Sequence, residues 1–209
     1  MRKLIKTLLR EGLMTERAEG KHLIVVDVQP EYSSAFGRMG MDLFSYINEN
    51  RSRFAGLTFL YNGADTLGMI SEGDYRMWLT EEGLDEDIAY EVTMYDKGYA
   101  FFRYCIDNGI EHDSIVRLVK YMYENGVNDS RDLDEEFWVG YVEEYGDDEI
   151  KELLEYADDC IHIPDLMDFL SRLNNVVLVG GGVNECLKEV EIAMEALGKN
   201  FETWDRFTY

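Results

Sequence analysis

The fold of this chain is decided by one strand-to-helix segment, Asn175-Val176-Val177-Leu178-Val179-Gly180-Gly181-Gly182-Val183-Asn184-Glu185-Cys186-Leu187. The apolar run before the glycines predicts a buried strand, and apolar residues at helical spacing from Leu187 predict a helix that Gly198 ends. Asn184 is suited to be the N-cap, so Cys186 would lie in the first turn. Backbone amides and the helix dipole there favour a thiolate. The alternative is a cysteine that packs as a small apolar side chain in the core.

Two further segments have the pattern of strands that deliver a charged residue to a turn. The apolar run from His22 ends at Asp27, and the segment Glu91–Phe102 carries Lys97. In a parallel sheet Asp27, Lys97 and Cys186 would all emerge at the carboxyl edge, where open α/β folds keep their sites. Together they form a coherent nucleophilic set, because a lysine stabilises a thiolate. The alternatives are an acid that binds loop amides and a surface lysine.

These motifs, in this order, resemble those of the isochorismatase-like cysteine hydrolases. The segment Val26-Asp27-Val28-Gln29 is similar to the V-D-x-Q context at the end of the family's first strand. The segment Lys97-Gly98-Tyr99-Ala100-Phe101 is similar to its lysine motif, often K-x-x-x-S-A-F, and is one residue shorter. The spacing from Gly180 to Cys186 also matches. Segments of the type G-G-G-x-N-E-C-L and D-K-G-Y-A-F-F-R also resemble uncharacterised proteins of large tailed bacteriophages.

The resemblance implies a role for each residue of the set. Asp27 would take the thiol proton, Cys186 would attack an amide, ester or related carbon, and Lys97 would stabilise charge. The residues that would contact the substrate are Gln29, Tyr99, Phe101, Gly182 and Val183. The residues alone favour plainer roles, in which the glutamine orients the turn after the first strand and the two aromatic side chains belong to the core.

The chain departs from the family near the cysteine and after the second strand. Glu185 directly precedes Cys186, where the family usually has a threonine and small residues, and its charge disfavours a thiolate. The family's cis peptide falls in this region, which makes Gly182-Val183 the candidate. One branch of the family binds a metal through an Asp and two His after the second strand. Residues 60–68 contain no histidine, so we expect no metal.

No cofactor is expected either. Gly180 and Gly182 begin a G-x-G-x-x-G dinucleotide pattern, but Glu185 stands at its third position and would repel a phosphate. The run 128–134 is similar to a calcium loop, but Leu133 occupies the position at which an EF-hand needs glycine.

Composition favours a single domain over residues 1–209 that works in the cytoplasm. The net charge of −23, from 43 acidic and 20 basic residues, disfavours nucleic acid and anionic membranes as partners and suits a basic protein. Three scattered cysteines fit a reducing cytoplasm, which would be the host's if a phage encodes the protein. No apolar run is long enough to span a membrane. Association into a homo-oligomer stays open.

The alternation of strands and helices predicts a three-layer α/β/α sandwich with a parallel, Rossmann-like sheet. The same patterns predict a strand over about 22–28, a helix over about 39–51, a second strand near 57–61, a polar loop after it, and a helix over about 71–82 that Ser71 is suited to cap. A leading helix is expected over 1–20 and a helical acidic insertion over 105–160. Thirteen acids and one base lie in 132–159, where apolar residues would dock the helices and the charges would face water. A second hypothesis follows: the fold is kept without catalysis, and the insertion binds a basic host or viral protein.

Overall fold

The computed structural model describes residues 18–65, 68–97, 102–127, 133–146, 150–152 and 166–209. These residues divide into two compact units. Unit 1 holds the described parts of Met1–Asp96, Asn174–Gly181 and Phe201–Tyr209. Unit 2 holds those of Lys97–Leu173 and Gly182–Asn200. The leading helix expected over 1–20 lies almost entirely outside the described residues, and the single domain stays a prediction.

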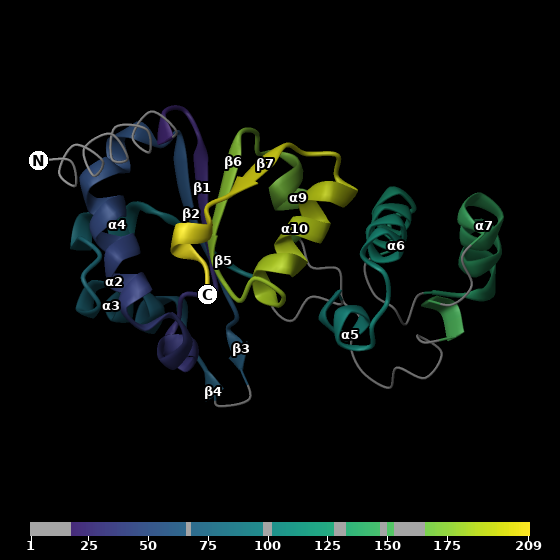
Figure 1. Ribbon diagram of the computed structural model, residues 1–209, viewed down its shortest axis with the longest axis horizontal. Coiled ribbons are helices and arrows are strands. Elements are labelled where there is room, and N and C mark those ends of the chain that lie inside the picture. The colour runs from purple at the N-terminus through teal and green to yellow at the C-terminus, as the bar shows by residue number, and fades with distance from the viewer. Residues whose placement is uncertain (1–17, 66–67, 98–101, 128–132, 147–149, 153–165) are drawn as a thin grey trace, which may run out of the picture. The chain divides into compact units, whose positions relative to one another are not determined.

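Unit 1 is built on a five-stranded sheet (Figure 1). Its strands lie in the order β5 (Thr93–Asp96), β2 (Gly56–Tyr61), β1 (His22–Val26), β6 (Val176–Gly180) and β7 (Phe201–Thr203). Every neighbouring pair is parallel, and Val26 is level with both Leu60 and Gly180. These features confirm the expected α/β class with a parallel, Rossmann-like sheet flanked by helices.

The strands form where apolar residues run without interruption. The last four residues of β1 and all five of β6 are buried, so both faces of these strands are covered, as is usual in parallel sheets. The first strand ends at Val26, two residues before its predicted end, because Asp27 has a φ of 46° and cannot continue it. The strand expected within 91–102 is β5, which covers 93–96.

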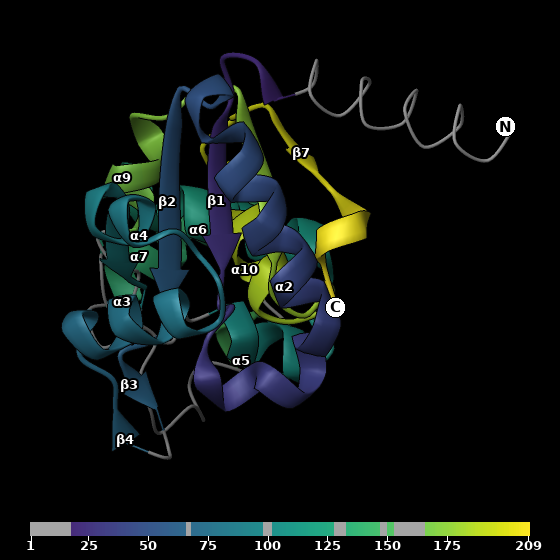
Figure 2. The same cartoon turned by 90° about the vertical axis from the view of Figure 1, so that its left-hand side faces the viewer.

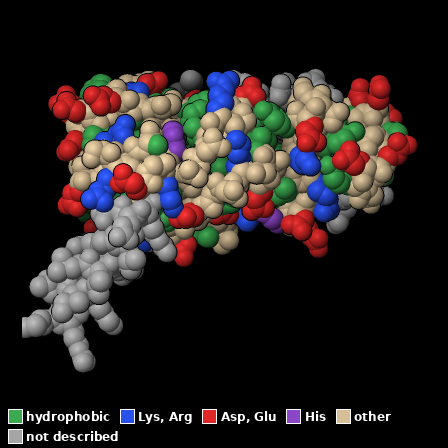
Figure 3. Space-filling model, turned by 90° about the horizontal axis from the view of Figure 1, so that it is seen from above, with side chains coloured by type: hydrophobic (Ala, Val, Ile, Leu, Met, Phe, Trp, Pro, Cys, Tyr) green, Lys and Arg blue, Asp and Glu red, His purple; other side chains and the backbone are tan. Residues whose placement is uncertain are grey.

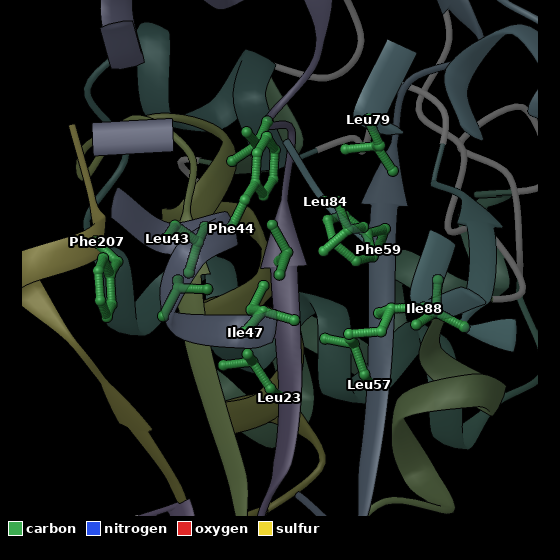
Figure 4. Packing of buried hydrophobic residues seen from close by; sticks show 14 of the residues in the cluster. Leu23, Leu43, Phe44, Ile47, Leu57, Phe59, Leu79, Leu84, Ile88 and Phe207 are labelled. Atoms are coloured by element: carbon green, nitrogen blue, oxygen red, sulfur yellow. The ribbon is translucent and has the colours of Figure 1, made fainter. Parts of the chain in front are cut away.

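Three helices cover one face of the sheet in unit 1 (Figure 2). They are α2 (Ser33–Asn50), α3 (Glu72–Glu81) and α4 (Glu86–Glu91). Their apolar side chains meet those of β1 and β2 in one core cluster, to which the 3-10 helix η4 (Asp205–Phe207) adds Phe207. Figure 4 shows members of this cluster, among them Leu23, Leu57 and Phe59 from the strands and Leu43, Phe44 and Ile47 from α2.

Two of these helices differ from the prediction. The helix expected over 39–51 begins at Ser33, because two helical segments join at Gly37, whose φ of 41° makes a kink. No helix was expected at 86–91, where α4 forms. The prediction for α3 is confirmed, since the Ser71 hydroxyl accepts a hydrogen bond from the Asp74 N–H as an N-cap. Beyond the end of β2, a short hairpin of β3 (Ala64–Asp65) and β4 (Gly68–Met69) replaces the expected loop.

Unit 2 is helical in all its described elements. Its helices are α5 (Phe102–Asp107), α6 (His112–Glu124), α7 (Glu135–Tyr145), α9 (Leu166–Ser171) and α10 (Cys186–Ala196). Helix α10 packs against α6, α9 and α5, and α6 packs against α7. The helical character predicted for 105–160 is confirmed in its described helices.

Helix α7 shows how the acidic segment is held. Asp134 caps it by accepting a hydrogen bond from the Phe137 N–H at 2.8 Å, and Gly146 ends it in the left-handed conformation. Phe137 and Tyr141 are buried, and their rings contact the ring of Tyr121 on α6. The acidic side chains of the helix are exposed; they are Glu135, Glu136, Glu143 and Glu144. The expected division into an apolar docking face and a charged outer face is therefore confirmed for α7.

Acidic side chains are dispersed among neutral and hydrophobic ones over the face shown in Figure 3. Among the described residues, no helix is both long enough and apolar enough to cross a membrane.

Candidate functional site

The carboxyl edge of the sheet in unit 1 carries polar residues directly after three neighbouring strands. Asp27 follows β1, Asn62 follows β2, and Asp96 ends β5. Because the strands are parallel, all three lie at one edge. The side chains of Asp27 and Asn62 are almost fully buried. The sequence prediction that Asp27 emerges at this edge is correct, and for Lys97 and Cys186 it stays a prediction.

Asp27 has a strained backbone. Its φ of 46° is uncommon for a residue with a side chain, and such conformations cluster at functional sites. Its N–H donates to the Leu60 carbonyl at 2.9 Å, which continues the pairing of β1 with β2 for one residue. Its carbonyl accepts a hydrogen bond from the Tyr209 hydroxyl at 3.2 Å. The backbone of Asp27 is thus fixed from both sides, and its side chain is only 1% exposed.

Gln29 fixes the turn that follows Asp27. Its side-chain carbonyl accepts a hydrogen bond from the Asn62 N–H at 2.9 Å, and its amide nitrogen donates to the Glu31 carboxylate at 3.0 Å. The side chain is fully buried. The bond with Asn62 joins the ends of β1 and β2, and the bond with Glu31 holds the segment after β1, which supports the orienting role that the sequence favoured. Contact with a substrate stays a prediction.

Gly180 and Tyr75 hold the other side of this turn. A Cβ atom at Gly180 would lie 2.7 Å from Val28 Cγ2 and closer still to the Val26 carbonyl, so a side chain has no room there. The φ of Gly180 is 77°, which also favours glycine. The Tyr75 hydroxyl, fully buried, donates to the Val28 carbonyl at 2.9 Å. The turn after Asp27 is therefore fixed by the sheet, by α3 and by Gln29.

Unit 2 contains the other two predicted catalytic residues, Lys97 and Cys186. The Lys97 ammonium donates to the Glu189 carboxylate at 3.1 Å, and the two side chains are 2% and 3% exposed. Lys97 is therefore a buried, paired lysine, and not the surface lysine that was the alternative. Glu189 lies on α10, three residues after Cys186.

Cys186 is the first residue of α10, and its side chain is half-buried. The helix start differs in detail from the prediction, because the N-cap is Glu185 and not Asn184, and no side chain caps it. The Gly182 carbonyl instead accepts hydrogen bonds from the Glu185 and Leu187 N–H groups at 2.9 and 3.2 Å. These bonds tighten the turn before the helix. All described peptide bonds are trans, so the expected cis peptide at Gly182-Val183 is not formed.

Glu185 lies close over this turn. A Cβ atom at Gly182 would lie 3.1 to 3.2 Å from the Glu185 side chain, including its carboxylate. A carboxylate at the start of α10 opposes both a thiolate at Cys186 and a bound anion. The charge predicted from the sequence to act against the thiolate is therefore at the helix start.

The two described cysteines differ in environment. Cys105 on α5 is fully buried, and burial raises the pKa of its thiol to about 12. Cys186 is half-buried at a helix start. Cys160, the third cysteine, lies outside the described residues.

The remaining predicted site residues have mixed outcomes. Tyr99 and Phe101 lie outside the described residues. Gly182 is buried, whereas Val183 is 49% exposed. Asp27 belongs to unit 1, and Lys97 and Cys186 belong to unit 2, so the convergence of all three stays a prediction. In the described ranges, no three His, Cys, Asp or Glu residues form a group that could hold a metal ion.

A cavity of about 690 Å³ lies elsewhere in unit 1. It is open to solvent and is lined by the end of α2, by the 3-10 helix η2 (Arg51–Arg53) and by α4. Helix η2 precedes β2, so the cavity lies toward the amino end of that strand and away from Asp27. The buried polar groups, and not this cavity, therefore form the candidate site.

Glu189 is not among the residues predicted from the sequence, although the sequence carries a signal for it. Ile192, Ala193 and Ala196 lie three, four and seven residues after Glu189 and are buried with it. This spacing marks a second apolar stripe on α10, which extends the buried arc to include Glu189. Comparisons with protein-family models, with curated proteins and with solved structures find no match for this chain.

Proposed function

We propose that this protein is an isochorismatase-like cysteine hydrolase that cleaves an amide, ester or related bond in a small molecule. One observation carries the proposal. Asp27 is buried in a strained conformation at the carboxyl end of the central strand β1, and the neighbouring strand β6 leads along the chain to Cys186 at the start of α10. An acid and a cysteine that leave adjacent parallel strands suit nucleophilic catalysis.

In the proposed reaction the Asp27 carboxylate takes the proton from the Cys186 thiol. The sulfur attacks the carbonyl carbon of the substrate and forms a C–S bond, while the carbonyl π electrons move to oxygen. The tetrahedral intermediate collapses, the bond to the leaving group breaks, and the leaving group takes the proton from Asp27. Water then attacks the thioester carbon while Asp27 accepts its proton, the C–S bond breaks to release the acid product, and the Cys186 sulfur takes the proton back from Asp27.

Lys97 supplies positive charge in this scheme. A nearby ammonium favours the thiolate over the thiol and also stabilises the anionic tetrahedral intermediate. The carboxylate of Glu189 partly offsets the positive charge of Lys97. The ammonium therefore stabilises a thiolate at Cys186 less than a lysine without a counterion would. No cofactor or metal is part of the proposal, and the cytoplasm is the compartment that suits a reactive thiol.

The second candidate is a non-catalytic protein of the same fold that binds a basic host or viral protein. Two observations favour it. The Lys97–Glu189 pair is already neutral as a whole, and α7 presents four exposed glutamates on its outer side. The exposed negative charge would attract a basic partner by long-range electrostatics, and the binding would weaken as the salt concentration rises.

Mass spectrometry of a bacterial metabolite extract tests the catalytic proposal. The extract is incubated with the wild-type protein, with Cys186→Ser and with Cys105→Ser as a matched thiol control. We expect at least one metabolite to be consumed by the wild type and the control but not by Cys186→Ser. Consumption that persists in Cys186→Ser, or none by the wild type, contradicts the proposal. Retention of a basic protein at low salt and its release at high salt would then support the second candidate.

A further inference from the structure

The buried pair in unit 2 is a feature that the proposed reaction uses only in part. Lys97 takes part in it, whereas Glu189 has no assigned role. Both side chains are nearly inaccessible, and their charged atoms are 3.1 Å apart. Burial of a carboxylate and an ammonium is costly unless each offsets the other.

The position of Glu189 on α10 indicates a function for its carboxylate. It follows Cys186 by three residues, so the two side chains project from neighbouring positions of successive helical turns. The carboxylate therefore holds the ammonium of Lys97 about one turn from the thiol. A buried lysine without a counterion loses its proton and becomes a neutral amine.

We propose that Glu189 is a positioning residue, which keeps Lys97 protonated and holds its ammonium within one helical turn of Cys186. The proposal rests on the proposed function in one respect, the use of Cys186 as the nucleophile. It adds a fourth residue to the set of Asp27, Lys97 and Cys186. Glu189 acts through Lys97 and does not need to touch the substrate.

Glu189 also has a direct electrostatic effect on Cys186, and this effect opposes the one just proposed. As a negative charge near Cys186 it would oppose the thiolate directly, as Glu185 does. The pair as a whole stabilises the thiolate only if the attraction between the ammonium and the sulfur is stronger than the repulsion between the carboxylate and the sulfur. Removal of the Glu189 charge therefore distinguishes the two effects. Other charged groups with described side chains on α10 and on the helices packed against it are Glu185, Lys188 with Glu191, His112 with Glu195, Asp107, Asp113, Arg117, Lys120 with Glu124, and Asp168.

The experiment is the pH profile of Cys186 alkylation by iodoacetamide in the full chain, followed by peptide mass spectrometry. In Glu189→Gln we expect the apparent pKa of Cys186 to rise by about one unit, with alkylation at neutral pH about tenfold slower. Lys97→Met should show the same direction, and Glu189→Asp should restore most of the rate. The matched control, Glu185→Gln, removes a negative charge beside Cys186 without touching the pair and should lower the apparent pKa.

A fall in the apparent pKa of Cys186 in Glu189→Gln, or no change, overturns the proposal. If the single variants do not fold, the double variant Lys97→Met/Glu189→Met removes both charges and keeps the site apolar. A wild-type pKa in that variant also overturns the proposal. Alkylation needs no substrate, so a rise in the pKa of Cys186 supports the role of Glu189 even if the metabolite assay shows no hydrolysis.

Discussion

The ammonium of Lys97 donates a hydrogen bond to the carboxylate of Glu189 at 3.1 Å, although 92 residues separate them in the chain. Both side chains are at most 3% exposed. The pair ties the segment after β5 to helix α10, and it places a counterion beside the lysine of the predicted catalytic set. It therefore links the stability of unit 2 to the proposed chemistry.

The first prediction concerns the stability of this pair. Lys97→Met should lower the free energy of unfolding by about 3–5 kcal/mol, because it leaves Glu189 buried without its counterion. The double variant Lys97→Met/Glu189→Met should recover most of that loss, since two apolar side chains can replace a buried ion pair. Urea denaturation measures both. In the exposed control Lys120→Met the change should stay within about 0.5 kcal/mol. A Lys97→Met loss no larger than the control's would show that the pair contributes little.

The second prediction concerns the thiols. Burial raises the pKa of Cys105 to about 12, so at pH 8 almost none of it is thiolate, and it is also inaccessible. Cys186 is half-buried at a helix start and should react faster. We expect iodoacetamide at pH 8 to label Cys186 well before Cys105 in the folded protein. Peptide mapping checks this, and earlier labelling of Cys105 or Cys160 would contradict it.

The third prediction tests the turn that holds Asp27. Gly180→Ala should destabilise the protein by more than Gly20→Ala does. Both glycines have a positive φ, 77° and 69°, but only Gly180 lacks room for a Cβ atom. The strained φ alone costs about 1–2 kcal/mol, and the clash with Val26 and Val28 adds to it. Thermal unfolding compares the two variants, and equal losses would show that the turn adjusts freely.

The fourth prediction tests the docking of α7. Tyr141→Ala should expose the amides of residues 138–145 to hydrogen exchange, because its ring is buried against Tyr121 and Phe137. Val139→Ala, on the exposed side of the same helix, serves as the control and should leave protection unchanged. Truncation of a buried aromatic side chain typically costs about 3–5 kcal/mol, enough to undock a short helix. If the wild-type α7 exchanges at random-coil rates, the docked helix is refuted.

Much of the sheet could be predicted from the sequence. The strands β1, β2 and β6 are apolar runs bounded by polar or glycine residues, and such runs suit strands buried on both faces. The capping of α3 by Ser71 also follows from local chemistry. In these places one local pattern suffices to specify the structure.

Other elements depend on contacts that no local pattern reveals. Helix α4 has only six residues, too few for a periodic signal, and its place is fixed by the burial of Ile88 and Ala89. The start of α10 was placed one residue early, because Glu185 is the N-cap and the Gly182 carbonyl accepts the N–H bonds before it. Tertiary contacts and backbone bonds, rather than side-chain preference, decide both.

The candidate site, too, could be predicted from the sequence only in part. The positions of Asp27 and Cys186 at a strand end and a helix start follow from the apolar runs before them. The partner of Lys97 could not be predicted in this way. Glu189 is distant from Lys97 in the chain, and a charged side chain is usually expected to be exposed. A buried glutamate becomes predictable only when the second apolar stripe of α10 is taken into account.

The proposed chemistry requires above all that Asp27, Lys97 and Cys186 form one site. A crystal structure of the full chain tests it most directly, through the distances from Cys186 Sγ to the Asp27 carboxylate and to Lys97 Nζ. We expect the sulfur to lie within reach of both groups, directly or through one water, at no more than about 6 Å. A sulfur more than about 8 Å from both groups, beyond direct or single-water hydrogen bonding, would contradict the claim.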